Sequence, residues 1–182
     1  MEFVTRQHIS AFEVYWEKNT LGKNNWEQEY NLPKWGMAFY AAHFNQYIGN
    51  GYGLHPYISI PIINNRVYHL DFRMGAGLGY ISNPFDGIDN FKNVAIGTPI
   101  NAFLTLLVDS YFRLNDRTNL HTNIAFTHFS NASFAKPNLG INIPTIGIGL
   151  DYNFGEKAAL EVNREIDFIR KEHPIKLSIR TG

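Results

Sequence analysis

A histidine and a serine stand two positions apart in the stretch "THFSNASF". His128 and Ser130 come at the end of an alternating run. The apolar positions of that run are Leu120, Ile124 and Phe126, and the same parity reaches both polar residues. An imidazole can act as a general base and a hydroxyl as a nucleophile, and here both lie on one side of one strand. The spacing also arises by chance, and polar residues at the rim of a membrane barrel often only contact lipid head groups, so both readings stay open.

The next alternating run brings one more polar residue to this face. Counting back from Ile146 places Asn142 on the same face, provided that Pro144 introduces no bulge. A catalytic group on an apolar face that meets lipid predicts a lipid substrate. His121 falls on the opposite face from His128, which argues against a metal ion held by the two.

Composition excludes several classes of function. The chain has 182 residues, which suits one domain, and its 16 basic and 16 acidic residues give no overall field for nucleic acid. Without cysteine there is no disulfide, thiolate metal site or cysteine nucleophile. No uninterrupted apolar run approaches the length of a membrane-spanning helix, and residues 1–12 do not read as a secretory signal. The aromatic content of 15% favours strands or an interfacial belt.

The elements that must position these groups read as strands. Seven alternating runs carry apolar residues on one face, and acids, bases and glycines on the other, as a narrow lumen requires. We therefore expect an all-β fold: an antiparallel eight-stranded outer-membrane-type β-barrel. It would be a single domain over 1–182, with strands mainly in 4–154, a connection at 155–171 and a closing strand in 172–182. A soluble barrel with an apolar ligand inside would alternate in the same way and is the rival fold.

The connections differ in length. Tight turns are expected near 63–66 and 115–117, and longer loops at 45–51, 82–99 and 131–140. In outer-membrane barrels the long loops face outward, which puts the His128 stretch at the outer rim. The glycines of "GAGLG" lie on the lumen side of their strand, so we expect packing and no nucleotide loop.

The segment "HFSNA" and the following "KPNLGI" resemble the signature of the PagL-type lipid A 3-O-deacylases, which are outer-membrane esterases of Gram-negative bacteria. The resemblance is dense over this motif and architectural elsewhere. It implies that Ser130 is the nucleophile, that His128 is its general base and that Asn131 is linked to the oxyanion hole. It also implies that Asn138 shapes the loop or the site. Where the family has a glutamate that orients the histidine, this chain has Asn142, whose amide oxygen can still accept the imidazole proton but brings no charge.

The resulting hypothesis is an outer-membrane serine esterase that removes an ester-linked acyl chain from lipid A without a metal or cofactor. Its expected partners are lipopolysaccharide as substrate, membrane lipids and, as an option, a second copy of the chain; nucleic acid is not expected. The alternative is a catalytically silent barrel that binds lipid or has a structural role, which Asn142 favours.

Overall fold

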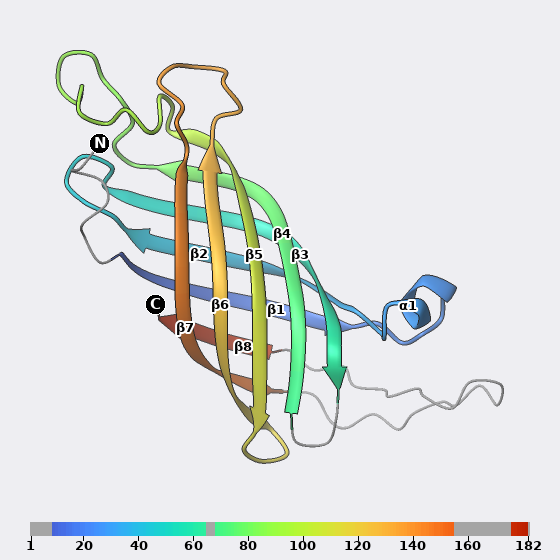
Figure 1. Ribbon diagram of the computed structural model, residues 1–182. Helices are drawn as coiled ribbons and strands as arrows, with labels where there is room; N and C mark the ends of the chain where they lie inside the picture. The colour runs from blue at the N-terminus through green and yellow to red at the C-terminus, as the bar shows by residue number, and fades with distance from the viewer. Residues whose placement is uncertain (1–8, 65–67, 155–175, 182) are drawn as a thin grey trace.

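The computed structural model describes residues 9–64, 68–154 and 176–181 (Figure 1). One short helix and the strands follow one another along the chain as β1 Ser10–Asn19, α1 Asn25–Glu29, β2 Lys34–His43, β3 Asn50–Asn64, β4 Tyr68–Ile81, β5 Ile100–Arg113, β6 Thr118–Ser130, β7 Ile141–Asn153 and β8 Lys176–Thr181.

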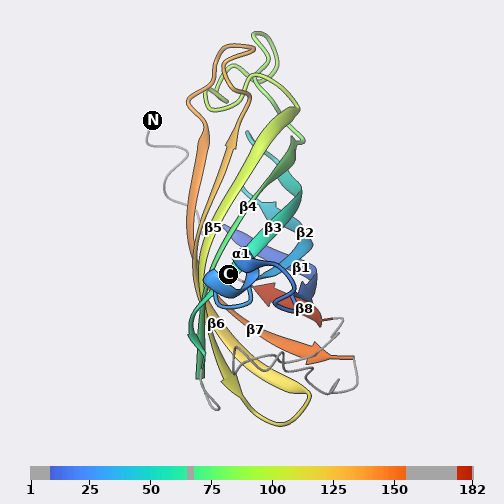
Figure 2. The ribbon, with the colours of Figure 1, turned by 90° about the vertical axis from the view of Figure 1, so that its right-hand side faces the viewer.

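Strands β1 to β7 are antiparallel and form one strongly curled sheet, in which each strand pairs with the next along the chain (Figure 2). The prediction of an all-β antiparallel fold is confirmed. The backbone of the short β8 is in register with β1 on one side and β7 on the other. The expected connection at 155–171 lies outside the described residues, as do residues 4–8 at the start of the expected strand region.

Helix α1 was not expected from the sequence. It lies in the connection between β1 and β2, at the same end of the sheet as the tight turn between β5 and β6 (Figure 1). The Glu27 carboxylate accepts hydrogen bonds from the Lys23 N–H at 2.8 Å and from Asn24 Nδ2 at 2.7 Å, which closes the first turn. Such a short helix has too little periodicity to be recognised in a sequence. No helix in the part of the chain that the structure describes is long and apolar enough to cross a membrane.

The two faces of the sheet differ as the alternation predicted. Along β5, for example, Leu104 and Leu106 are exposed whereas Thr105 and Asp109 are buried. The parity of β2, which the sequence left ambiguous, follows the same rule, since its large side chains at odd positions point outward. These outward side chains are Trp35, Met37 and Phe39.

Charged groups fill the concave interior of the sheet toward the tight-turn end. The Arg73 guanidinium is fully buried, pairs with Glu13 and lies over the rings of Tyr15 and Tyr57, 4.8 and 4.5 Å from their centroids. Lys34 Nζ lies 2.6 Å from an Asp71 carboxylate oxygen. Pairing of this kind offsets the cost of removing the charges from water.

The interior toward the long loops is apolar instead. Phe129 and Phe103 are fully buried with ring centroids 5.0 Å apart, and Tyr40 packs against both. Gly79 makes room for this cluster, because a Cβ there would lie 2.7 Å from the Phe129 ring. The prediction that the glycines of "GAGLG" serve packing is therefore confirmed for Gly79.

Candidate active site

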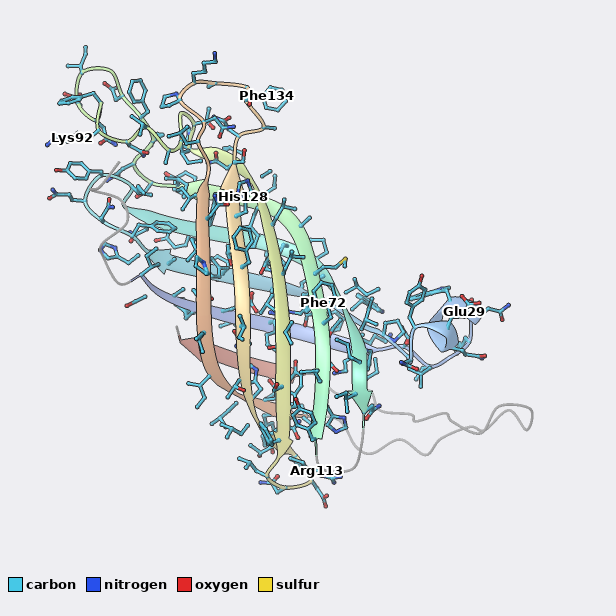
Figure 3. All side chains as sticks on the ribbon, viewed as in Figure 1. Glu29, Phe72, Lys92, Arg113, His128 and Phe134 are labelled. Atoms are coloured by element: carbon cyan, nitrogen blue, oxygen red, sulfur yellow. The ribbon has the colours of Figure 1, made fainter. Side chains whose placement is uncertain are left out.

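The predicted site lies where β6 ends, at the end of the sheet that carries the long loops 44–49, 82–99 and 131–140 (Figure 1). His128 and Ser130 are both partly exposed on the outward face of β6, while Phe129 between them is fully buried inside. Figure 3 shows His128 near the upper end of β6, below the loop whose tip carries Phe134. The inward ring of Phe129 thus anchors the backbone from which both polar side chains project.

His128 contacts the side chain of Asn142 on the neighbouring strand. His128 and Asn142 are direct cross-strand partners in an uninterrupted β6–β7 register, so Pro144 introduces no bulge. The imidazole Nδ1 and the Asn142 amide oxygen are 2.7 Å apart. When Nδ1 donates this proton, Nε2 is left as the basic nitrogen.

Ser130 is surrounded by donors from the loop that follows it. Asn138 Nδ2 donates to Ser130 Oγ at 3.1 Å, and the backbone N–H of Ala132 donates to the same oxygen at 3.2 Å. The Asn138 amide oxygen accepts the backbone N–H of Asn131 at 3.2 Å. The Asn138 side chain therefore joins the end of the loop 131–140 to its beginning, next to Ser130.

Asn131 organises the turn after β6. Its side chain is buried, donates to the Ala135 carbonyl at 3.0 Å and accepts the Ser133 N–H at 3.0 Å. Ala132 and Ser133 have positive φ values of 53° and 66°, which L residues adopt only when the surrounding structure holds them. The Asn131 amide is engaged within the loop, and it is the Ala132 N–H that reaches Ser130.

No hydrogen bond joins His128 to Ser130, although both side chains are described. The serine hydroxyl is turned toward Asn138 instead, with its Oγ 3.4 Å from the amide oxygen. In proteins without bound substrate, catalytic hydrogen bonds are often long or absent and form in the substrate complex. The structure brings His128, Ser130, Asn138 and Asn142 to one patch of the outward face. The contact through which Ser130 would pass its proton to His128 is not formed in it.

Gly140 allows the loop to return beside the imidazole. Its φ is +74°, and a Cβ there would lie 2.9 Å from His128 Cε1. Only glycine adopts this conformation at no steric cost while leaving room for the ring.

A groove of about 720 Å³ crosses the outward faces of β3 to β6 and ends at His128. Outward side chains along it are apolar apart from the imidazole, and its lining includes Pro56, Met74, Ala76, Leu104, Phe126 and His128. Ala76 is small among large neighbours on the outward face of β4, which deepens the surface there. An apolar groove of this kind suits a hydrocarbon chain.

Sequence reasoning missed the Ala132 N–H and the groove. A backbone donor has no signature in residue types, because any residue could supply it. The groove has a faint signal in Ala76, which stands between Met74 and Leu78 in the outward positions of its strand. Among the described residues no group of three His, Asp or Glu side chains could hold a metal ion.

The chain was compared with protein families, curated proteins and solved structures. Comparison with curated proteins and comparison with solved structures each find no match. The family described as lipid A 3-O-deacylase (PagL) matches residues 10–151, which is more than three quarters of the 182 residues. This match includes β1 to β6 and the motif loop with most of β7. The protein therefore belongs to the lipid A 3-O-deacylase (PagL) family.

Proposed function

We propose that the protein is a serine esterase of the bacterial outer membrane that removes an ester-linked acyl chain from lipid A. Family membership implies lipid A 3-O-deacylase activity. The observation that carries the serine mechanism is the convergence of Ser130, His128 and Asn138 on the outward face, at the end of an apolar groove. A site that faces away from the interior suits a substrate held in the surrounding lipid.

The proposal includes a closed eight-stranded barrel formed by the chain as one domain. Its support is the backbone register of β8 with both β1 and β7, since a closed sheet leaves no unpaired edge in the membrane. The apolar outward face and the charged interior agree with this setting. Every residue of the proposed site comes from one chain, so the proposal does not depend on a homodimer.

The proposed reaction begins with attack of Ser130 Oγ on the ester carbonyl carbon. The serine hydroxyl turns from Asn138 toward His128, and Nε2 of the imidazole takes its proton. The tetrahedral intermediate then collapses, the sugar oxygen leaves with the proton from His128, and an acyl-serine remains. Water activated by His128 attacks this ester, and the fatty acid is released with Ser130 restored.

The donors around Ser130 are placed to stabilise the intermediate. Asn138 Nδ2 and the Ala132 N–H already point at the serine oxygen, so an oxyanion formed next to it lies within their reach. In this scheme Asn131 serves the oxyanion hole indirectly, by holding the turn that presents Ala132. Asn142 fixes the imidazole tautomer in place of the family glutamate.

A catalytically silent barrel that binds lipid is the second candidate. It is favoured by the neutral Asn142 and by the missing hydrogen bond between His128 and Ser130. The same groove would then hold an acyl chain without cleaving it.

Incubation with purified lipopolysaccharide, followed by mass spectrometry of lipid A, separates the two candidates. The parent protein is expected to remove one acyl chain, and the Ser130→Ala variant none. Migration of unheated samples on SDS gels reports whether both are folded. A folded parent that leaves lipid A intact would establish the silent barrel, and a Ser130→Ala variant as active as the parent would remove the serine from the mechanism.

A further inference from the structure

Asn93 lies in the loop 82–99, which contributes no residue to the proposed chemistry. We infer that Asn93 is a positioning residue for the active site. It holds the neighbouring loop 131–140 in the arrangement that places Asn138 on Ser130. The catalytic consequence rests on the proposed function, whereas the structural coupling of the two loops does not.

The Asn93 side chain fixes the backbone that follows it. It is 1% exposed, and its amide oxygen accepts the N–H groups of Ala95 at 3.1 Å and Ile96 at 3.3 Å. Its Nδ2 donates to the Asn83 carbonyl at 2.6 Å. A buried side-chain amide whose oxygen and nitrogen are both hydrogen-bonded specifies one conformation of the segment. Removing it would leave buried N–H groups without an acceptor.

The segment that Asn93 fixes is bonded to the loop of the active site. The Ala95 carbonyl accepts the Gly140 N–H at 3.1 Å, and Ile96 forms an antiparallel bridge with Asn138. Ile96 is fully buried in the apolar cluster that also contains Phe129. The backbone of loop 131–140 is therefore held by Ala95 and Ile96, and the N–H groups of both residues donate to the Asn93 side chain.

Gly97 brings the two loops into direct contact at a second point. A Cβ at Gly97 would lie 2.8 Å from the Pro137 carbonyl oxygen and 3.0 Å from that of Lys136. Even one added methyl group would have to push this part of the loop 131–140 away.

The two residues of loop 131–140 that are held in this way contact the two reactive side chains, Ser130 and His128. Asn138, bridged to Ile96, donates to Ser130 Oγ at 3.1 Å. Gly140, bonded to Ala95, lies against the His128 ring. Asn93 is thus a positioning residue, since it acts on the serine and the imidazole only through the backbone of two loops.

The test compares Asn93→Ala with Asn90→Ala. Asn90 is a matched control, because its side chain also ties the loop together through the carbonyls of Tyr47 and Pro84 but does not bond residues 95–96. Asn93→Ala is expected to lower kcat on lipid A about 10- to 100-fold with KM nearly unchanged, since a misplacement of catalytic groups by about 1 Å can cost about 100-fold. It is also expected to speed hydrogen–deuterium exchange in 131–140, whereas Asn90→Ala leaves both measurements near the parent values.

The two measurements distinguish failure of this inference from failure of the proposed function. Unchanged exchange of 131–140, or unchanged kcat, in a folded Asn93→Ala variant would overturn the inference. An inactive parent would overturn the proposed function, and the exchange data would still decide whether Asn93 holds the loop.

Gly97→Ala is a second variant, which keeps the inference testable if Asn93→Ala does not fold. It disturbs residues 136–137 directly and is expected to lower kcat and speed exchange in the same loop. Parent-like kcat and exchange in Gly97→Ala would contradict the coupling of the two loops.

Discussion

Replacing Asn142 with aspartate is expected to raise kcat. Aspartate has the shape of asparagine, so the 2.7 Å contact to His128 Nδ1 is kept and only a negative charge is added. The imidazole becomes positively charged when it takes the proton of Ser130, and a carboxylate stabilises that state whereas an amide does not. The ground state, with a neutral imidazole, gains much less.

The size of the gain follows from the geometry of this contact. Unit charges about 4 Å apart attract by about 1 kcal/mol in water and about 4 kcal/mol at an effective dielectric constant of about 20. Asn142 is exposed at the loop end of β7, where the proposed membrane-facing surface meets head groups and water, which favours the lower part of this range. A gain of about 1–2 kcal/mol in the transition state corresponds to an increase in kcat of about 5- to 30-fold.

The assay is the rate of acyl-chain release from lipid A by parent, Asn142→Asp and Asn142→Leu proteins at neutral pH, where aspartate is ionised. The leucine variant removes the acceptor and is expected to be slower than the parent, because the imidazole is then free to turn and to change tautomer. Higher salt should reduce the advantage of the aspartate variant, since the site is exposed. If the aspartate variant is no faster than the parent and the leucine variant no slower, Asn142 does not orient His128 and the reasoning is refuted.

Three further variants probe the loop, the groove and the interior. Gly140→Ala is expected to lower kcat about 10-fold, because a positive φ and a Cβ 2.9 Å from His128 Cε1 displace the ring; a parent-like rate would contradict this. Ala76→Phe fills the groove, so kcat/KM should fall for lipid A but not for a short-chain soluble ester, and an equal fall for both would point to misfolding. Arg73→Ala leaves the buried Glu13 without its guanidinium partner, at a cost of about 3–5 kcal/mol. The folded band on SDS gels should then be lost at a lower temperature, and an unchanged temperature would argue against this ion pair as a source of stability.

Much of the sheet could be predicted from the sequence because strand alternation is a local property. Each run of outward apolar and inward polar residues reports its own two faces, whatever its neighbours are. The outward direction of His128 and Ser130 followed from this parity, and so did the inward position of Gly79. Helix α1 was missed because it is too short to show a helical periodicity in the sequence. It is held by hydrogen bonds to the Glu27 side chain, which a sequence pattern does not reveal.

The sequence by itself determined the all-β fold, the face on which the candidate residues lie and, through the motif, the family. Tertiary structure alone decided what those residues touch. It places Asn138 on Ser130 while the Asn131 side chain bonds within its own turn, and it brings the loop of Asn93 against the active site. Such contacts join segments that are far apart along the chain, or depend on backbone groups that every residue carries. They are set by strand register and by loops packed together, which residue types and spacing do not encode locally.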